Sequence, residues 1–168
     1  MTPASWLTDH VHLLPPAGRV LDVASGRGRH ALWLAARGFD VHAVDRSADA
    51  MTALRAEAIR RGVRLEAELL DLETGRAPLI ANAYDAVVVV HYLHRPLFPM
   101  LIAALRPGGV MIYETFTVAQ ARRGKPTNPD FLLEPGELPR LVAPLEVVEW
   151  REGEFDERDV ASLVARRT

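Results

Sequence analysis

The chain has 168 residues, 49% of them hydrophobic and 25% charged, which suits a globular protein with its own hydrophobic core. The formal net charge of −2 excludes a strong overall attraction to nucleic acid, and the absence of cysteine excludes disulfides, thiolate nucleophiles and cysteine metal sites. No apolar run approaches the roughly 18 residues of a membrane helix, so we expect no membrane partner.

Residues 1–18 predict a helical segment that precedes the alternating pattern of the rest. Apolar residues recur at helical spacing over residues 6–14, and Pro15 and Pro16 end the pattern. This start lacks the basic-then-apolar layout of a signal peptide, so we expect a cytoplasmic protein. Residues 1–168 are predicted to form a single domain.

From residue 19 onward, short apolar runs alternate with stretches of helical periodicity. The valine run at 86–90 is typical of a strand buried on both faces of a parallel sheet. Residues 145–150 and 160–166 also predict strands, and the link at 152–157 is too short for a crossover helix, so they should pair antiparallel. The other predicted strands are 19–23, 39–44, 63–70 and 110–116, and the predicted helices are 31–37, 47–61, 78–82, 96–105 and 137–142.

Strands that alternate with helices predict an α/β fold: a doubly wound, mostly parallel sheet of seven strands with an antiparallel last strand. In such sheets ligands bind beyond the carboxyl ends of the strands, where the strand order reverses. Residues 117–136 show little periodicity, and a loop of that length in a compact domain is usually functional or disordered. We therefore expect this segment to lie on the substrate side.

The stretch 20–30 has the order strand, glycine turn, helix, which makes a binding platform. Gly26 and Gly28 let backbone N–H groups approach a ligand closely, because no Cβ intervenes. The helix that follows presents unpaired N–H groups to an anionic group. Asp45, after the second strand, can accept hydrogen bonds from two ribose hydroxyls, and Asp71, after the third, can accept one from an adenine amino group.

These residues resemble the class I S-adenosylmethionine-dependent methyltransferases. The glycine turn is similar to their first motif, Asp45 to their ribose-binding acid, and Asp71 with Leu72 to their adenine-binding pair. The turn at 105–109 and the terminal hairpin are similar as well. Within the class, the sequence resembles the tellurite-resistance methyltransferases and related small bacterial enzymes over residues 28–35, 128–138 and 163–167.

The resemblance implies S-adenosyl-L-methionine as cofactor, S-adenosyl-L-homocysteine as product, and in-line methyl transfer accelerated mainly by alignment of acceptor and methyl group. It implies no metal and no dedicated catalytic residue. Ala24 stands where the class usually has the first glycine of its motif, and alanine restricts positive φ. The implied cofactor-binding residues are Asp22, Ala24, Gly26, Gly28, Asp45, Arg46, Met51, Asp71, Leu72 and His91.

The acceptor site is expected beyond the fourth and fifth strands, with residues 117–136 closing above it. Histidine and arginine donate hydrogen bonds there and suit a small anionic or polar molecule. The Asn/Asp-Pro-Pro-aromatic tetrapeptide of methyltransferases that modify exocyclic amines of bases is missing, so we expect no nucleic-acid partner, and a monomer or homodimer. The predicted substrate-binding residues are Tyr92, His94, Arg95 and Glu114, next to His91.

Two alternatives stay open. The spacing Gly26-x-Gly28-x-x-Ala31 satisfies a dinucleotide fingerprint and would suit an NAD-dependent oxidoreductase, although 168 residues leave no room for a separate substrate domain. The other alternative is a catalytically silent protein of the same fold that binds a cofactor or a partner, which the departure at Ala24 keeps open.

Overall fold

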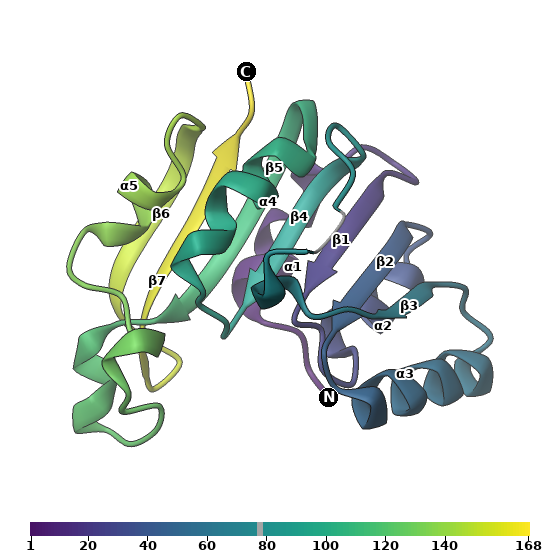
Figure 1. Cartoon of the computed structure of the whole chain (residues 1–168), viewed down its shortest axis with the longest axis horizontal. Coiled ribbons are helices and arrows are strands. Elements are labelled where there is room, and N and C mark those ends of the chain that lie inside the picture. The colour runs from purple at the N-terminus through teal and green to yellow at the C-terminus, as the bar shows by residue number, and fades with distance from the viewer. Residues whose placement is uncertain (77–78) are drawn as a thin grey trace.

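The computed structural model describes residues 1–76 and 79–168, which are built around one seven-stranded sheet (Figure 1). The strands are β1 Arg19–Val23, β2 Asp40–Asp45, β3 Glu66–Leu69, β4 Tyr84–Val90, β5 Leu105–Phe116, β6 Glu146–Phe155 and β7 Arg158–Arg166. They lie in the order β3-β2-β1-β4-β5-β7-β6. Neighbours from β3 to β5 pair in parallel, whereas β7 is antiparallel to both β5 and β6. The predicted sheet is confirmed.

The strand order reverses between β1 and β4. From β1 the chain proceeds outward to β2 and β3, and then returns to β4 on the other side of β1. The carboxyl ends of β1 and β4 therefore flank the crevice in which doubly wound sheets bind ligands. The glycine turn follows β1, and His91 follows β4.

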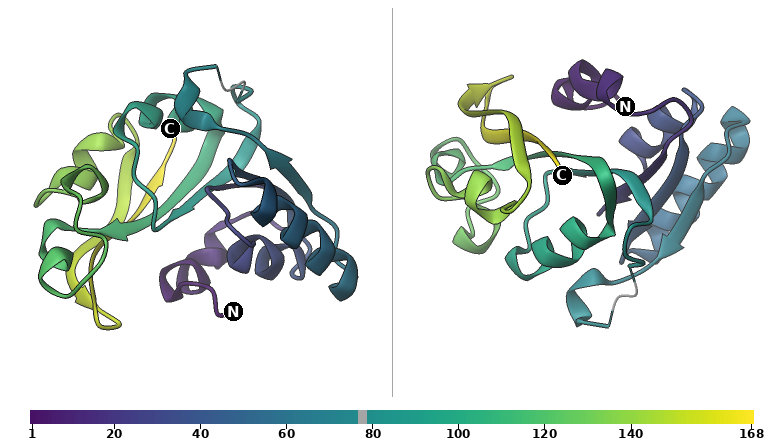
Figure 2. Two further views of the ribbon diagram at one scale, coloured as in Figure 1. Left: turned by 60° about the horizontal axis from the view of Figure 1, so that its bottom comes forward. Right: turned by 90° about the horizontal axis from the view of Figure 1, so that it is seen from above.

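Helices cover both faces of this sheet (Figure 2). Because β4 is central, both of its faces are buried, as the valine run predicts: Val87 and Val89 pack on one side, Ala86 and Val88 on the other. The helices that share the core of Val88 are α1 Ser5–His10, α2 Arg29–Ala35 and α3 Ala48–Arg61, and those on the face of Val87 are α4 Phe98–Ala104 and α5 Glu137–Leu141. No helix among the described residues is long and apolar enough to span a bilayer.

The hairpin of β6 and β7 is longer than predicted. The polar stretch 152–157 was expected to be the link, but pairing continues to Phe155 and Arg158, and only Asp156 and Glu157 make the turn. Both turn residues have positive φ, 53° and 63°, as the tight hairpin turns that match strand twist require. Most residues of β6 are exposed at this sheet edge, so polar side chains do not interrupt the strand.

Other boundaries also differ from the prediction. The strand expected at 63–70 is only the four residues of β3, which pairs with β2 alone. The helix expected at 96–105 is a 3₁₀ turn followed by α4. The helix expected at 78–82 lies partly outside the described residues, and residues 79–82 are not helical.

The segment 117–136 is folded against the end of β5. It contains 3₁₀ turns at Val118–Arg122 and Pro129–Phe131. The Leu133 N–H donates to the Phe116 carbonyl over 2.9 Å, and the Val118 N–H donates to the Leu133 carbonyl over 2.9 Å. These bonds place the segment at the carboxyl end of the sheet, where the functional site was expected.

Candidate active site

The two glycines of the turn after β1 have different surroundings. Gly28 has φ +88°, and a Cβ there would lie 2.2 Å from Leu54 Cδ1, so close packing against α3 excludes a side chain. Gly26 has φ +55°, and a Cβ there would meet no atom within 4 Å. Gly28 therefore serves the packing of the turn, while Gly26 leaves its outer side open for a ligand.

Ala24 also adopts the left-handed region, with φ +53°. The methyl group makes this conformation cost on the order of 1 kcal/mol relative to a right-handed one. The departure from glycine noted in the sequence is therefore a position where the native backbone favours glycine.

Asp45 holds the turn from the end of β2. Its Oδ2 accepts from the Gly26 N–H over 2.9 Å, and its Oδ1 accepts from the Ser47 N–H over 2.8 Å. The side chain thus joins the glycine turn to the start of α3. Each carboxylate oxygen has a second lone pair, so further hydrogen bonds can still be accepted.

A hollow, here called the first cleft, lies beyond the carboxyl ends of β1, β2 and β3. Asp71 is held on its rim, because Oδ1 accepts from the Glu73 N–H over 3.0 Å. The predicted cofactor-binding residues that line the first cleft are Ala24, Asp45, Arg46, Asp71 and Leu72.

Met51 does not belong to that lining. Its side chain is fully buried in the core between α3 and the sheet, with Leu54 and Ala58 from the same helix. The sequence placed it beside the cofactor because it follows Asp45 closely. The helical turn directs it inward instead.

A second hollow, here called the second cavity, adjoins the first cleft. The two share Arg46, Glu73 and Tyr92. Beyond these three, the second cavity is lined by residues that include His91, Phe116, Lys125 and Phe131. The segment 117–136 thus contributes Lys125 and Phe131 to its wall.

Two buried polar atoms have no hydrogen-bond partner among the described residues: Asp22 Oδ2 in β1 and His91 Nε2 in the second cavity. Burial raises the pKa of Asp22 to about 7. Burial and, to a smaller extent, the charges of Arg29 and Arg158 lower the pKa of His91 to about 4. His91 is therefore neutral at pH 7. A bound ligand or an ordered water can complete the hydrogen bonding of such buried groups.

His91 has an unusual backbone for a residue with a side chain. Its φ is +57°, its N–H donates to the Glu114 carbonyl over 2.8 Å, and its ring stacks on Phe116 with centroids 4.5 Å apart. Strained residues of this kind cluster at functional sites. The sequence grouped His91 with the cofactor, whereas the structure places it in the second cavity.

The structure brings only one of the four predicted substrate-binding residues, Tyr92, into the second cavity. Burial raises the pKa of Tyr92, and Glu73 raises it further, so the phenol keeps its proton. His94 points elsewhere: its Nδ1 lies 3.1 Å from Glu73 Oε1, in a neighbouring hollow beside Leu72. Of this predicted segment, Tyr92 lines the second cavity and His94 lines the neighbouring hollow.

Arg95 and Glu114 are engaged in the fold itself. Arg95 donates to Glu137 over 2.6 Å and 2.9 Å and to the Leu132 carbonyl over 2.8 Å, which ties the segment 117–136 to the end of β4. Glu114 accepts from Ser162 Oγ over 2.5 Å and lies 3.6 Å from the Arg151 guanidinium. Neither lines the second cavity.

Sequence reasoning did not select seven residues that line the second cavity: Glu73, Leu93, Thr115, Phe116, Lys125, Pro126 and Phe131. Lys125 carried one available signal, since it is the only lysine and lies in the aperiodic segment. Glu73 comes four residues after β3 and Phe116 is the last residue of β5, so the reasoning from strand ends that selected Asp45 would have found them. Phe131 lies in the stretch 128–138 that resembles the tellurite-resistance methyltransferases, but nothing in that resemblance assigned it to the acceptor site.

Residues 20–109 match the model of a family described as a methyltransferase domain. The chain belongs to this family. Among curated relatives, the chain is 37% identical to an uncharacterized methyltransferase of Mycobacterium tuberculosis over 58% of this chain and 40% of that protein. It is 30% identical to hemagglutinin 1 of Eikenella corrodens over 90% of this chain and 51% of that protein.

A third relative is named ribosomal RNA small subunit methyltransferase C, from Alcanivorax borkumensis, with 30% identity over 60% of this chain and 33% of that protein. The chain thus spans about half the length of these curated relatives, or less.

Among solved structures, the chain is similar to TehB from Haemophilus influenzae, with 22% identity, a TM-score of 0.77, and coverage of 99% of this chain and 63% of that one. It is also similar to an S-adenosylmethionine-dependent methyltransferase from Mesorhizobium loti, with 17% identity, a TM-score of 0.76 and 98% coverage of both chains. These likenesses establish the Rossmann-like methyltransferase fold.

S-adenosylmethionine is the cofactor that this family and fold imply. The described residues fit it in chemistry. The first cleft offers the carboxylates of Asp45 and Asp71 for polar groups of a nucleoside, and the unpartnered oxygen of Asp22 suits an ammonium group. Gly26 leaves open space where the cofactor must approach the backbone.

Proposed function

We propose that this chain transfers the sulfonium methyl group of S-adenosylmethionine to a small anionic or polar acceptor. The observation that carries the proposal is the shared wall of the two hollows: Arg46, Glu73 and Tyr92 line both. A cofactor in the first cleft would then lie next to an acceptor in the second cavity. Holding two reactants in line is the main requirement of methyl transfer.

The cofactor roles follow from the carboxylates of the first cleft. Asp45 would accept from the ribose hydroxyls with the lone pairs that Gly26 and Ser47 leave free. Asp71 would accept from the adenine amino group, with Leu72 and Arg46 against the ring. Asp22 would accept from the amino group of the methionine part, since its buried Oδ2 has no partner among the described residues.

The bound cofactor supplies an electrophilic methyl group on a positively charged sulfur. The chain's own residues would hold the acceptor against it and keep water away. His91 stacks on Phe116, and Tyr92 and Phe131 add aromatic surface to the same cavity. The neutral imidazole of His91 can hydrogen-bond to the acceptor through its unpartnered Nε2.

The charges of the second cavity favour an anionic acceptor. Lys125 and Arg46 contribute positive charge, and Glu73 contributes negative charge. Glu73 is already balanced, because it lies 3.5 Å from Arg46 and 3.1 Å from His94. That leaves Lys125 as the cation available to the acceptor, and an ammonium group suits a compact anion such as a carboxylate or an oxyanion.

The test is a transfer assay with S-adenosylmethionine labelled on the methyl group. Small carboxylates, thiols and oxyanions of tellurium, selenium and arsenic form one arm, and ribosomal RNA forms the other, because one relative carries an RNA methyltransferase name. We expect label in small molecules. Label in RNA alone would contradict the acceptor class, and label in neither, with tight NAD(H) binding, would contradict the activity.

Variants of Lys125 then test the proposed site. Lys125→Ala should lower kcat/KM for the anionic acceptor by about tenfold, mainly through KM, with unchanged cofactor affinity. Lys125→Arg should restore most of the activity. Arg122→Ala is the matched control, because Arg122 is an exposed cation of the same segment and does not line the cavity. Equal activity of Lys125→Ala and the control would contradict this acceptor site.

A further inference from the structure

Away from the candidate active site, three metal-binding side chains meet on the sheet face that carries α4. His42 lies in β2, and Glu66 and Glu68 lie in the edge strand β3 beside it. The imidazole is buried, while the two carboxylates are about half exposed. In Figure 1, α4 lies in front of β4 and β5, and no helix lies in front of β2.

The donor atoms of these residues already converge. His42 Nε2 lies 2.7 Å from Glu68 Oε2 and 3.7 Å from Glu66 Oε1. One donor atom from each residue falls within 4.8 Å of the other two. Zn²⁺ holds nitrogen and oxygen ligands at about 2.0–2.2 Å, so its ligand atoms lie roughly 3.4 Å apart. Small side-chain adjustments would create that spacing without a change of backbone.

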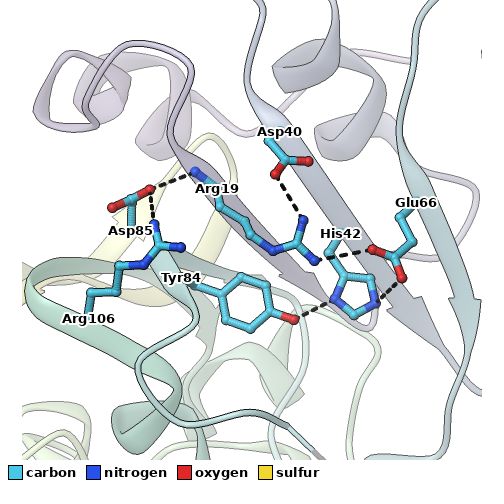
Figure 3. A network of polar contacts seen from close by, with 7 residues as sticks. All are labelled: Arg19, Asp40, His42, Glu66, Tyr84, Asp85 and Arg106. Carbon is cyan, nitrogen blue, oxygen red and sulfur yellow. Dashed lines mark hydrogen bonds and ion pairs between the residues drawn. The ribbon is translucent and has the colours of Figure 1, made fainter.

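Neighbouring residues hold the side chains of His42 and Glu66 in position (Figure 3). His42 Nδ1 lies 2.5 Å from the Tyr84 hydroxyl, which fixes the ring and leaves Nε2 directed at the carboxylates. Arg19 donates to Glu66 Oε2 over 3.2 Å and to Asp40 over 2.9 Å, so the other oxygen of Glu66, Oε1, faces His42. Metal sites typically have this outer shell around a ligating histidine and carboxylate.

We propose that His42, Glu66 and Glu68 bind one divalent transition-metal ion, such as Zn²⁺, that clips β3 to β2. One imidazole and two carboxylates leave at least one position for water on the exposed side, and nitrogen and oxygen donors of this kind suit Zn²⁺ or Co²⁺. The sequence predicted no metal, because the three residues are separated along the chain and only the β2–β3 register unites them.

The consequence is structural. β3 has four residues, pairs with β2 alone and buries none of them fully. The chain that leaves it, from Leu70 to Glu73, forms part of the first cleft. An ion that ties β3 to β2 would therefore stabilise the edge strand and the position of Asp71.

The test measures metal binding without reference to enzyme activity. After chelator treatment and dialysis, the full chain is titrated with Zn²⁺ by calorimetry and with Co²⁺ by visible absorption. We expect one equivalent to bind and the melting temperature to rise. Glu68→Gln should weaken binding at least tenfold and remove the thermal shift, and Tyr84→Phe should weaken binding about tenfold through loss of the orienting contact.

Glu57→Gln is the matched control, since Glu57 is a glutamate of α3 that pairs with Arg60 and Arg61 outside the cluster. It should bind metal like the unchanged chain. Glu68→Gln replaces a partly exposed side chain, so folding is expected to survive. Circular dichroism checks the fold of this variant and of Tyr84→Phe, whose side chain is buried in β4. Absence of stoichiometric binding, or binding that is equal in Glu68→Gln and in the control, would overturn the proposal.

Discussion

The first cleft is lined by residues that directly follow strands, whereas the second cavity takes part of its lining from a segment held by contacts far along the chain. In the first cleft, Asp45 is the last residue of β2 and Asp71 comes two residues after β3, so strand order alone brings them together. In the second cavity, Lys125 and Phe131 depend on Arg95, which ties their segment to the end of β4. The sheet topology therefore positions the residues of the first cleft, whereas the second cavity also needs contacts between residues far apart in the sequence.

The largest expected effect is the loss of cofactor affinity when Asp45 of the first cleft is replaced. Asp45→Ala should weaken S-adenosylmethionine binding on the order of 100-fold, because it removes the ribose acceptor and two hydrogen bonds that hold the turn, each charged bond contributing about 1.5–3 kcal/mol. Calorimetric titration measures the affinity. Asp49→Ala, an exposed acid in the first turn of α3, is the control and should bind normally. Unchanged affinity in folded Asp45→Ala would refute the ribose role.

The second prediction concerns the anchor of the acceptor side. Arg95→Lys keeps the charge but loses the forked contact with Glu137, so hydrogen exchange in residues 128–137 should accelerate. Acceptor kcat/KM should fall about five- to tenfold while cofactor affinity stays the same. Arg64→Ala, an exposed arginine distant from both hollows, should change neither quantity. If Arg95→Lys weakened cofactor binding instead, the two regions would not be separable.

The third prediction is a pH dependence that belongs to the first cleft. The pKa of Asp22 is raised from 3.8 to about 7 by burial, so the protonated carboxyl favours folding. Its stabilising contribution is complete below the unfolded value and is lost as pH rises through about 7. Between pH 6 and 8 the free energy of unfolding should fall by about 1 kcal/mol from this group, and Asp22→Asn should remove that slope.

Cofactor binding should show the opposite trend at the same residue. Only ionised Asp22 offers a charged acceptor to the cofactor amino group, so affinity should rise from pH 6 to 8, and by less in Asp22→Asn. Parallel titrations of the two proteins in the same buffers remove the contribution of the cofactor's own groups. Identical pH profiles would show that Asp22 does not touch the cofactor.

The smallest expected effect is at Ala24. Ala24→Gly should raise the free energy of unfolding by about 0.5–1 kcal/mol, because the relief of positive φ exceeds the entropy that glycine adds to the unfolded chain. Thermal melting should rise by roughly 1–4 °C. Ala17→Gly is the matched comparison, since Ala17 has φ 57° outside the first cleft. Only the change at Ala24 should tighten cofactor binding, and a lower melting temperature would contradict the strain.

The sheet and the first cleft could be predicted because their signals are local. Valine runs and glycine turns mark strands and their ends, and an acid directly after a strand must lie at the carboxyl edge. The expected cofactor contact of Met51 is not seen in the lining of the first cleft, because its position on α3 directs the side chain into the core although it is close to Asp45 in sequence. Proximity along the chain did not determine the direction of the side chain.

The sequence predicted which segments lie near the second cavity, but not which of their side chains line it. His91 takes φ +57° after β4, which redirects the chain so that Tyr92 enters the second cavity while His94 and Arg95 reach Glu73 and Glu137. Glu114 lies in β5, and its side chain reaches Ser162 on the paired strand β7. Each of these outcomes depends on a tertiary partner that no local pattern encodes.

A crystal structure with S-adenosyl-L-homocysteine bound tests the central claim most directly. The account predicts the ribose on Asp45, the adenine beside Asp71 and Leu72, and the sulfur directed toward the second cavity between Tyr92 and Phe116. A ligand bound outside the first cleft, or one whose sulfur faces away from the second cavity, would contradict it.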